Sequence, residues 1–118
     1  MKIELSAVWT PAQHEFDLFA RISGDDNPIH VDPEFSARTA FGRTVSHGML
    51  IYTKLWGLLT ASHPEVSQTA QSMMFPNPCY TGEAVDLVIS GDCPGVLSVQ
   101  AIRSADGAEL LVGETEVA

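Results

Sequence analysis

The stretch SHGMLIYTKLWGLLTAS, residues 46–62, decides the fold. Its apolar residues recur at helical spacing and cover nearly the whole circumference of the helix that they predict. A helix that is apolar on most of its sides needs protein around it rather than water. The stretch is interrupted by Lys54 and is too short to cross a bilayer. We therefore predict a buried central helix and no membrane span.

The residues on either side of this helix supply its covering. Four later segments (70–75, 83–90, 95–104 and 108–117) alternate polar and apolar residues and are separated by turn residues. Residues 2–9 alternate in the same way. The sequence therefore predicts an α+β domain over residues 1–118, in which a bent antiparallel sheet wraps around one long helix.

Two further helices are predicted before the central one. Residues 11–22 carry a start signal in which Thr10 is the N-cap, Pro11 takes the first helical position and Gln13 takes the capping-box position. Asp32 and Pro33 repeat this signal for a short helix that ends before residue 42.

The charge and cysteine content exclude several classes of protein. Six Lys and Arg face fifteen Asp and Glu, for a net charge of −9, so a nucleic-acid partner is not expected. Cys79 and Cys93 lack metal-ligand spacing and predict free thiols in a reducing compartment. The N-terminal residues form no continuous apolar core of a signal peptide, so a cytoplasmic location is expected.

The polar stretch SGDDNPIHVD, residues 23–32, is the first candidate for chemistry. Asp25 and His30 are five residues apart, so a helix would place them about 140° apart and a strand would place them on opposite faces. Only a folded turn brings them together, and Asn27 and Pro28 supply turn chemistry. A solvated turn with an incidental histidine is the alternative interpretation.

A converging carboxylate, carboxamide and imidazole would hold a water molecule and could perform general acid–base catalysis. Gly48 lies at the start of the central helix, where backbone N–H groups lack partners and the helix dipole favours negative charge. Its N–H is a candidate oxyanion donor. A glycine that only eases the helix start is the alternative.

Two neighbouring residues are interpreted more conservatively. His47 is interpreted as a packed, hydrogen-bonded core residue rather than as a base, and Ser46 as a helix cap. A metal site built from Asp25, His30, Asp32 and His47 matches none of the usual zinc spacings, so no metal is predicted.

The run FARISGDDNPIHVDPEFSARTAFGRTVSHGML, residues 19–50, resembles the MaoC-like R-specific enoyl-CoA hydratases. The later run FPNPCYTGEAVDL is also similar to that family. The resemblance implies the hotdog fold, usually as a homodimer or higher homo-oligomer in which two sheets join. It implies R-specific hydration of trans-2-enoyl-CoA, or the reverse dehydration, with a coenzyme A thioester as substrate and no cofactor. Carried onto this chain, the catalytic pair is Asp25 and His30, the supporting carboxamide is Asn27, and the oxyanion donor is the N–H of Gly48.

The resemblance also suggests how the substrate binds. Arg38 and Arg43 are the cations nearest the motif and are candidates for binding the coenzyme phosphates. Met49, Tyr52 and Trp56 lie on the central helix and are candidates for contacting the acyl group. Because Trp56 stands where relatives often have a smaller residue, we expect a short or unusual acyl chain. An acyl carrier protein could replace coenzyme A.

Two other functions are compatible with the same fold. A hotdog acyl-CoA thioesterase would use a carboxylate and a helix-start N–H to cleave the thioester. A non-catalytic acyl-thioester binding module would keep the polar turn without using it.

Overall fold

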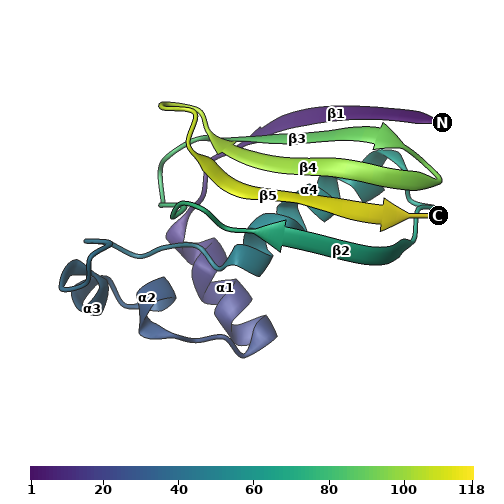
Figure 1. Cartoon of the computed structure of the whole chain (residues 1–118). Helices are drawn as coiled ribbons and strands as arrows, with labels where there is room; N and C mark the ends of the chain where they lie inside the picture. The colour runs from purple at the N-terminus through teal and green to yellow at the C-terminus, as the bar shows by residue number, and fades with distance from the viewer.

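The computed structural model describes residues 1–118 and consists of one antiparallel sheet and four helices (Figure 1). The five strands lie in the order β1-β3-β4-β5-β2, with bounds β1 Lys2–Trp9, β2 Gln68–Met74, β3 Val85–Asp92, β4 Gly95–Arg103 and β5 Glu109–Val117. The helices are α1 Gln13–Ser23, α2 Pro28–Val31, α3 Pro33–Ala37 and α4 Gly48–Ser62. No helix has the length and apolar character that a membrane span requires.

The long helix α4 lies along one face of the sheet (Figure 1) and contacts β1, β3, β4 and β5. Leu55 is fully buried in this contact, and its truncation to Ala would cost about 2–5 kcal/mol. The predicted central helix and antiparallel sheet are confirmed. The covering is incomplete, because Met49, Thr53 and Gly57 form an exposed stripe along α4.

The start of α1 differs from the prediction. The helix begins at Gln13 rather than at residue 11, and its N-cap is Ala12 rather than Thr10. Glu15 causes this shift because its Oε1 accepts hydrogen bonds from the Ala12 N–H and from the Trp9 indole, both at 3.0 Å. A carboxylate that bonds β1 and the helix start together fixes the start two residues later than the Thr-Pro signal.

Between α1 and α4 the chain forms two short helices at one end of the molecule (Figure 1). The predicted Asp32 cap of α3 is confirmed, since its Oδ1 accepts from the Phe35 N–H at 3.1 Å. The segment before it, predicted as an irregular turn, is the single helical turn α2. This part of the chain lies beside the start of α4 and brings the polar motif to it.

Candidate active site

A cavity of about 420 Å³ opens beside the start of α4. Three segments line it: the polar turn with residues 25, 29 and 30, the α4 start with residues 45–49 and 51, and the loop after β2 with residues 75–79. Phe41 and Leu110 complete the wall. The sequence motif and the helix start predicted to work together therefore face one hollow.

The turn places Asp25 next to His30. Gly24 ends α1 with a left-handed backbone, at φ 81°, and its N–H bonds to the Ala20 carbonyl. The chain then reverses direction and enters α2, which carries His30. Asp25 Oδ2 lies 3.7 Å from His30 Nε2. The prediction that a folded turn brings the carboxylate and the imidazole together is confirmed.

His30 is buried and is held by one ring nitrogen. Its Nδ1 lies 2.8 Å from the carbonyl oxygen of Val45. Because a carbonyl only accepts, this nitrogen carries the proton, and Nε2 of the neutral ring presents a lone pair beside Asp25. His30 can therefore take a proton at Nε2 without losing the bond that orients it.

Gly48 begins α4 and lines the same cavity. Its N–H is one of the helix-start donors that have no partner within the helix, at the positive end of the helix dipole. A Cβ at this position would lie 2.7 Å from the ring of Phe75, so the aromatic ring rests directly on the glycine. This contact could not be predicted from the sequence, because Phe75 follows β2 and is remote along the chain.

His47 also lines the cavity and is only 2 % exposed. Its ring stacks on His30 at a centroid distance of 3.8 Å, and its Nε2 lies 2.8 Å from the carbonyl oxygen of Asp25. The interpretation of His47 as a packed, hydrogen-bonded residue is confirmed, yet its partners are the two predicted catalytic residues. Ser46 does not cap α4, because its Oγ donates to the His47 carbonyl instead.

Asn27 has a different position from the other motif residues. Its Oδ1 accepts from the Ile29 N–H at 3.1 Å, which caps α2, and Asn27 does not line the cavity. The structure therefore brings Asp25, His30 and Gly48 together without the carboxamide. Asn27 contributes by fixing the helical turn that carries His30.

The residues proposed for substrate contact separate into two groups. Met49 lines the cavity. Tyr52 and Trp56 lie outside it and border another hollow with Thr53 and Gln68. The hydroxyl of Tyr52 hydrogen-bonds Gln68 and Thr115, and burial raises its pKa. Three buried residues that were not predicted to contact the substrate also line the cavity, namely Ile51, Cys79 and Leu110.

Cys79 contributes an apolar group to this lining. Burial raises the pKa of its thiol to about 12, so the sulfur stays protonated and is a poor nucleophile.

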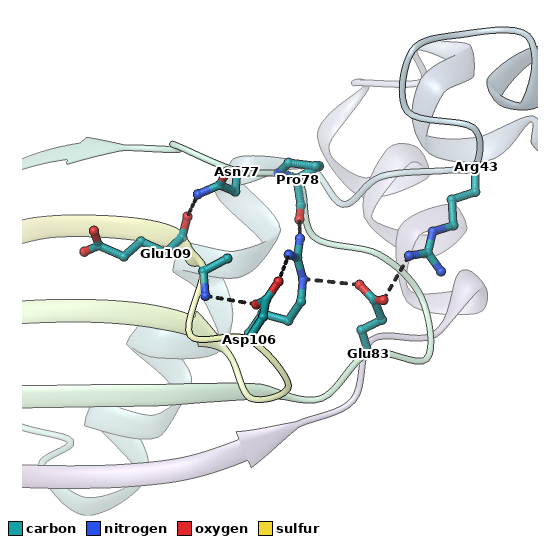
Figure 2. Close-up of polar contacts among 8 residues, drawn as sticks. Arg43, Asn77, Pro78, Glu83, Asp106 and Glu109 are labelled. Carbon is teal, nitrogen blue, oxygen red and sulfur yellow. Dashed lines mark hydrogen bonds and ion pairs between the residues drawn. The ribbon is translucent and has the colours of Figure 1, made fainter.

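Arg43 pairs with a side chain of the protein, Glu83 (Figure 2). Its Nη2 lies 2.9 Å from Glu83 Oε2, and its guanidinium stacks over the ring of Tyr80 at 3.9 Å. Glu83 also pairs with Arg103, whose side chain donates to the carbonyl of Pro78 at 2.6 Å. This network holds the loop that follows β2 against the cavity. Arg38 lies on the surface after α3 and is in no ion pair.

The ligand atoms of Asp25, His30 and His47 lie within 4.8 Å of one another, a spacing at which a cation could be held. One nitrogen of each ring already bonds a backbone carbonyl. These hydrogen bonds, together with the contact between Asp25 and His30, account for the arrangement without an ion.

Comparisons with known proteins agree with this geometry. The family model described as "MaoC like domain" matches residues 1–95. The chain is 34% identical over 110 residues to an (R)-specific enoyl-CoA hydratase of Aeromonas caviae, covering 87% of this chain and 82% of the relative. It is 36% identical over 77 residues to a 3-hydroxybutyryl-CoA dehydratase of Methylorubrum extorquens, covering 60% of this chain but 46% of that protein.

A solved structure of an (R)-hydratase from A. caviae superposes with a TM-score of 0.83 at 31% identity, covering 99% of this chain and 92% of that chain. The fold, the matched residues and the cavity at the start of α4 lead to one assignment. The chain belongs to the MaoC-like domain family.

Proposed function

We propose that this protein catalyses the reversible R-specific hydration of a trans-2-enoyl thioester to an R-3-hydroxyacyl thioester. One observation carries the proposal: the neighbouring side chains of Asp25 and His30 and the helix-start residue Gly48 line the same cavity. The similarity to an (R)-specific enoyl-CoA hydratase over most of both chains supports it.

The reaction needs a polarised thioester and an activated water. The thioester oxygen would accept a hydrogen bond from the Gly48 N–H. The negative charge that develops on this oxygen would then lie at the positive end of the α4 dipole. A water held between the Asp25 carboxylate and His30 Nε2 would add its oxygen to the β-carbon. The pair takes one proton from this water and delivers one to the α-carbon, so protons balance over the cycle. Asp25 and His30 act as a coupled pair in this scheme.

The substrate class is an acyl thioester, and we propose coenzyme A or an acyl carrier protein as its carrier. Four of the six Lys and Arg side chains pair with carboxylates in the structure: Lys2, Arg43, Lys54 and Arg103. Arg38 is one of the two that do not, and it is the candidate for a carrier phosphate. Asn27 supports the reaction through the α2 turn that holds His30.

We also propose that the protein acts as a homodimer in the cytoplasm. The strand β2 lies at an edge of the sheet, and six of its seven residues are exposed. Its outer edge offers unpaired backbone groups to a second copy of the chain.

The test is turnover of a panel of trans-2-enoyl-CoA thioesters, with the stereochemistry of the product determined. We expect loss of enoyl absorbance without release of free thiol, and an R product. Asp25→Asn should lose activity by about 10²–10⁴-fold, while the matched control Asp26→Asn, an exposed neighbour outside the cavity, should keep it. Release of free thiol would instead identify a thioesterase, and unchanged turnover in Asp25→Asn would reject this site.

A further inference from the structure

The ring of His47 contacts two other rings in the proposed site, those of His30 and Phe19. It stacks on His30 with an interplanar angle of 26° and packs against Phe19 in a tilted arrangement at a centroid distance of 4.8 Å. It directly precedes Gly48 and is the N-cap residue of α4, yet its side chain makes no capping bond. A buried polar side chain needs a hydrogen-bond partner, and His47 has its partner outside α4.

The segment that it serves is the turn carrying Asp25. His47 Nε2 lies 2.8 Å from the Asp25 carbonyl oxygen, and because that oxygen only accepts, Nε2 carries the proton. The other nitrogen, Nδ1, is buried and has no hydrogen-bond partner. Protonation would therefore place an unpaired N–H in the interior, next to His30. Burial lowers the pKa of His47, so the ring remains a neutral donor.

Asp25 has few other restraints. Its side chain is 57% exposed, and its carboxylate lies 3.7 Å from His30 Nε2, beyond hydrogen-bond distance. Its N–H bonds to Ser23 Oγ at 3.1 Å, within the same turn. The hydrogen bond from His47 therefore connects the Asp25 backbone to a residue 22 positions further along the chain, the one just before Gly48.

We propose that His47 is a positioning residue that fixes Asp25 relative to His30 and Gly48 by a single hydrogen bond to the Asp25 carbonyl. The effect on rate rests on the proposed function, whereas the hydrogen bond itself does not. His47 neither exchanges a proton nor touches the reacting atoms. It sets the distance between the carboxylate and the imidazole, and a misplacement of about 1 Å costs about 10²-fold in rate in comparable cases.

Two substitutions separate the hydrogen bond from the packing. His47→Phe keeps an aromatic ring against His30 and Phe19 but has no donor. His47→Gln keeps an N–H donor at the position of Nε2 but removes the ring. His14→Gln, at an exposed position on α1 outside the cavity, is the control.

Kinetics and a direct probe of the bond are measured on the same variants. With a short trans-2-enoyl-CoA we expect His47→Phe to lower kcat by about 10–100-fold with little change in KM, and His47→Gln to recover most of this loss. The ¹³C shift of the Asp25 carbonyl in NMR should change in His47→Phe and stay near its original value in His47→Gln. His14→Gln should alter neither.

The two readouts distinguish the possible failures. An unchanged Asp25 carbonyl shift in His47→Phe overturns the inference, whatever the activity. Equal losses of kcat in His47→Phe and His47→Gln, with melting temperatures lowered alike, would reduce His47 to a packing role and also overturn it. If no variant, including the unaltered protein, hydrates enoyl thioesters, the proposed function fails while the carbonyl shift still tests the hydrogen bond.

Discussion

His30 shows how one side chain combines a structural and a chemical task. Nδ1 donates to the Val45 carbonyl, and Nε2 is directed toward Asp25. In His30→Asn the side-chain amide can still donate to Val45, because its nitrogen takes the place of Nδ1. We expect this variant to keep its melting temperature within a few degrees and to lose about 10²–10⁴-fold in turnover.

His30→Ala is the comparison that tests this explanation. It leaves the buried Val45 carbonyl without its donor, which costs about 1–3 kcal/mol. Both variants should be inactive, but only the alanine should unfold at lower denaturant concentration. Equal stability of the two would show that the Nδ1 bond does not hold the ring.

At the same scale, the residues that could be predicted from sequence are those whose roles are local. Asp25, His30 and Gly48 could be predicted to lie together, because turn chemistry and helix starts can be recognised from residues a few positions apart. Phe75 and His47 were not assigned to the site, since their contacts join residues 27 and 22 positions apart. Asn27 was assigned a water-binding role, but the structure uses its oxygen to cap α2.

At the scale of one element, α4 permits a direct test of the oxyanion donor. Proline is tolerated at a first helical position, and the residue before it, His47, already has an extended backbone at φ −58° and ψ 140°. Because a side chain at Gly48 would collide with Phe75, the test uses a Phe75→Ala background. There, Gly48→Pro should turn over about 10²–10³-fold more slowly than Gly48→Ala, since the two differ mainly in the N–H.

The control for this pair lies on the same helix. A Cβ at Gly57 would meet nothing within 4 Å, so Gly57→Ala should raise stability by about 0.5–1 kcal/mol and leave turnover unchanged. Equal rates for Gly48→Pro and Gly48→Ala would remove the Gly48 N–H from the mechanism.

The helix α1 is tied to its neighbours by Glu15, and this tie depends on pH. Burial alone would raise the pKa of Glu15, but hydrogen bonds from Lys54, Trp9 and the Ala12 N–H outweigh it and hold the pKa below the ordinary value of 4.5. A carboxyl with a lowered pKa stabilises the folded state above the unfolded pKa, and this contribution disappears as pH falls through the folded value.

Glu15→Gln should therefore lower the free energy of unfolding by about 1–2 kcal/mol at pH 7 and have little effect near pH 3. Denaturant unfolding at the two pH values measures the difference. Asp17→Asn, at an exposed position on the same helix, is the control and should be nearly neutral at both. If Glu15→Gln lowers the free energy of unfolding by the same amount at pH 3 as at pH 7, the charge of Glu15 does not contribute to stability.

At the scale of the whole molecule, the predicted fold was correct in class and in most strand positions. The alternation of polar and apolar residues predicts strands because successive side chains along β3, β4 and β5 point to opposite faces of the sheet, and the two faces differ in burial. β2 is the exception. Side chains on both of its faces are exposed, so the alternation of polar and apolar residues along β2 does not correspond to an alternation of burial. The order of strands was not predicted, because placing β2 at the far edge beside β5 depends on contacts between distant segments.

The two edges of this sheet differ in how they are protected. β1 carries Lys2 and Glu4, and charges on an edge strand oppose pairing with another chain. β2 carries no charged residue. A second copy should therefore pair along β2 rather than along β1, and this difference makes the proposed dimer testable with matched substitutions on the two edges.

We expect light scattering to give a mass of twice the 12.7 kDa chain. Lysines at Ala70 and Ser72, both exposed on the outer face of β2, should weaken association at least about tenfold, because the substituted positions of two copies approach one another and repel. Lysines at Ser6 and Val8, exposed on the outer face of β1, make the matched control and should leave the dimer intact. Dissociation by the β1 pair but not by the β2 pair would place the interface on the other edge, and a monomeric unaltered protein would reject the dimer.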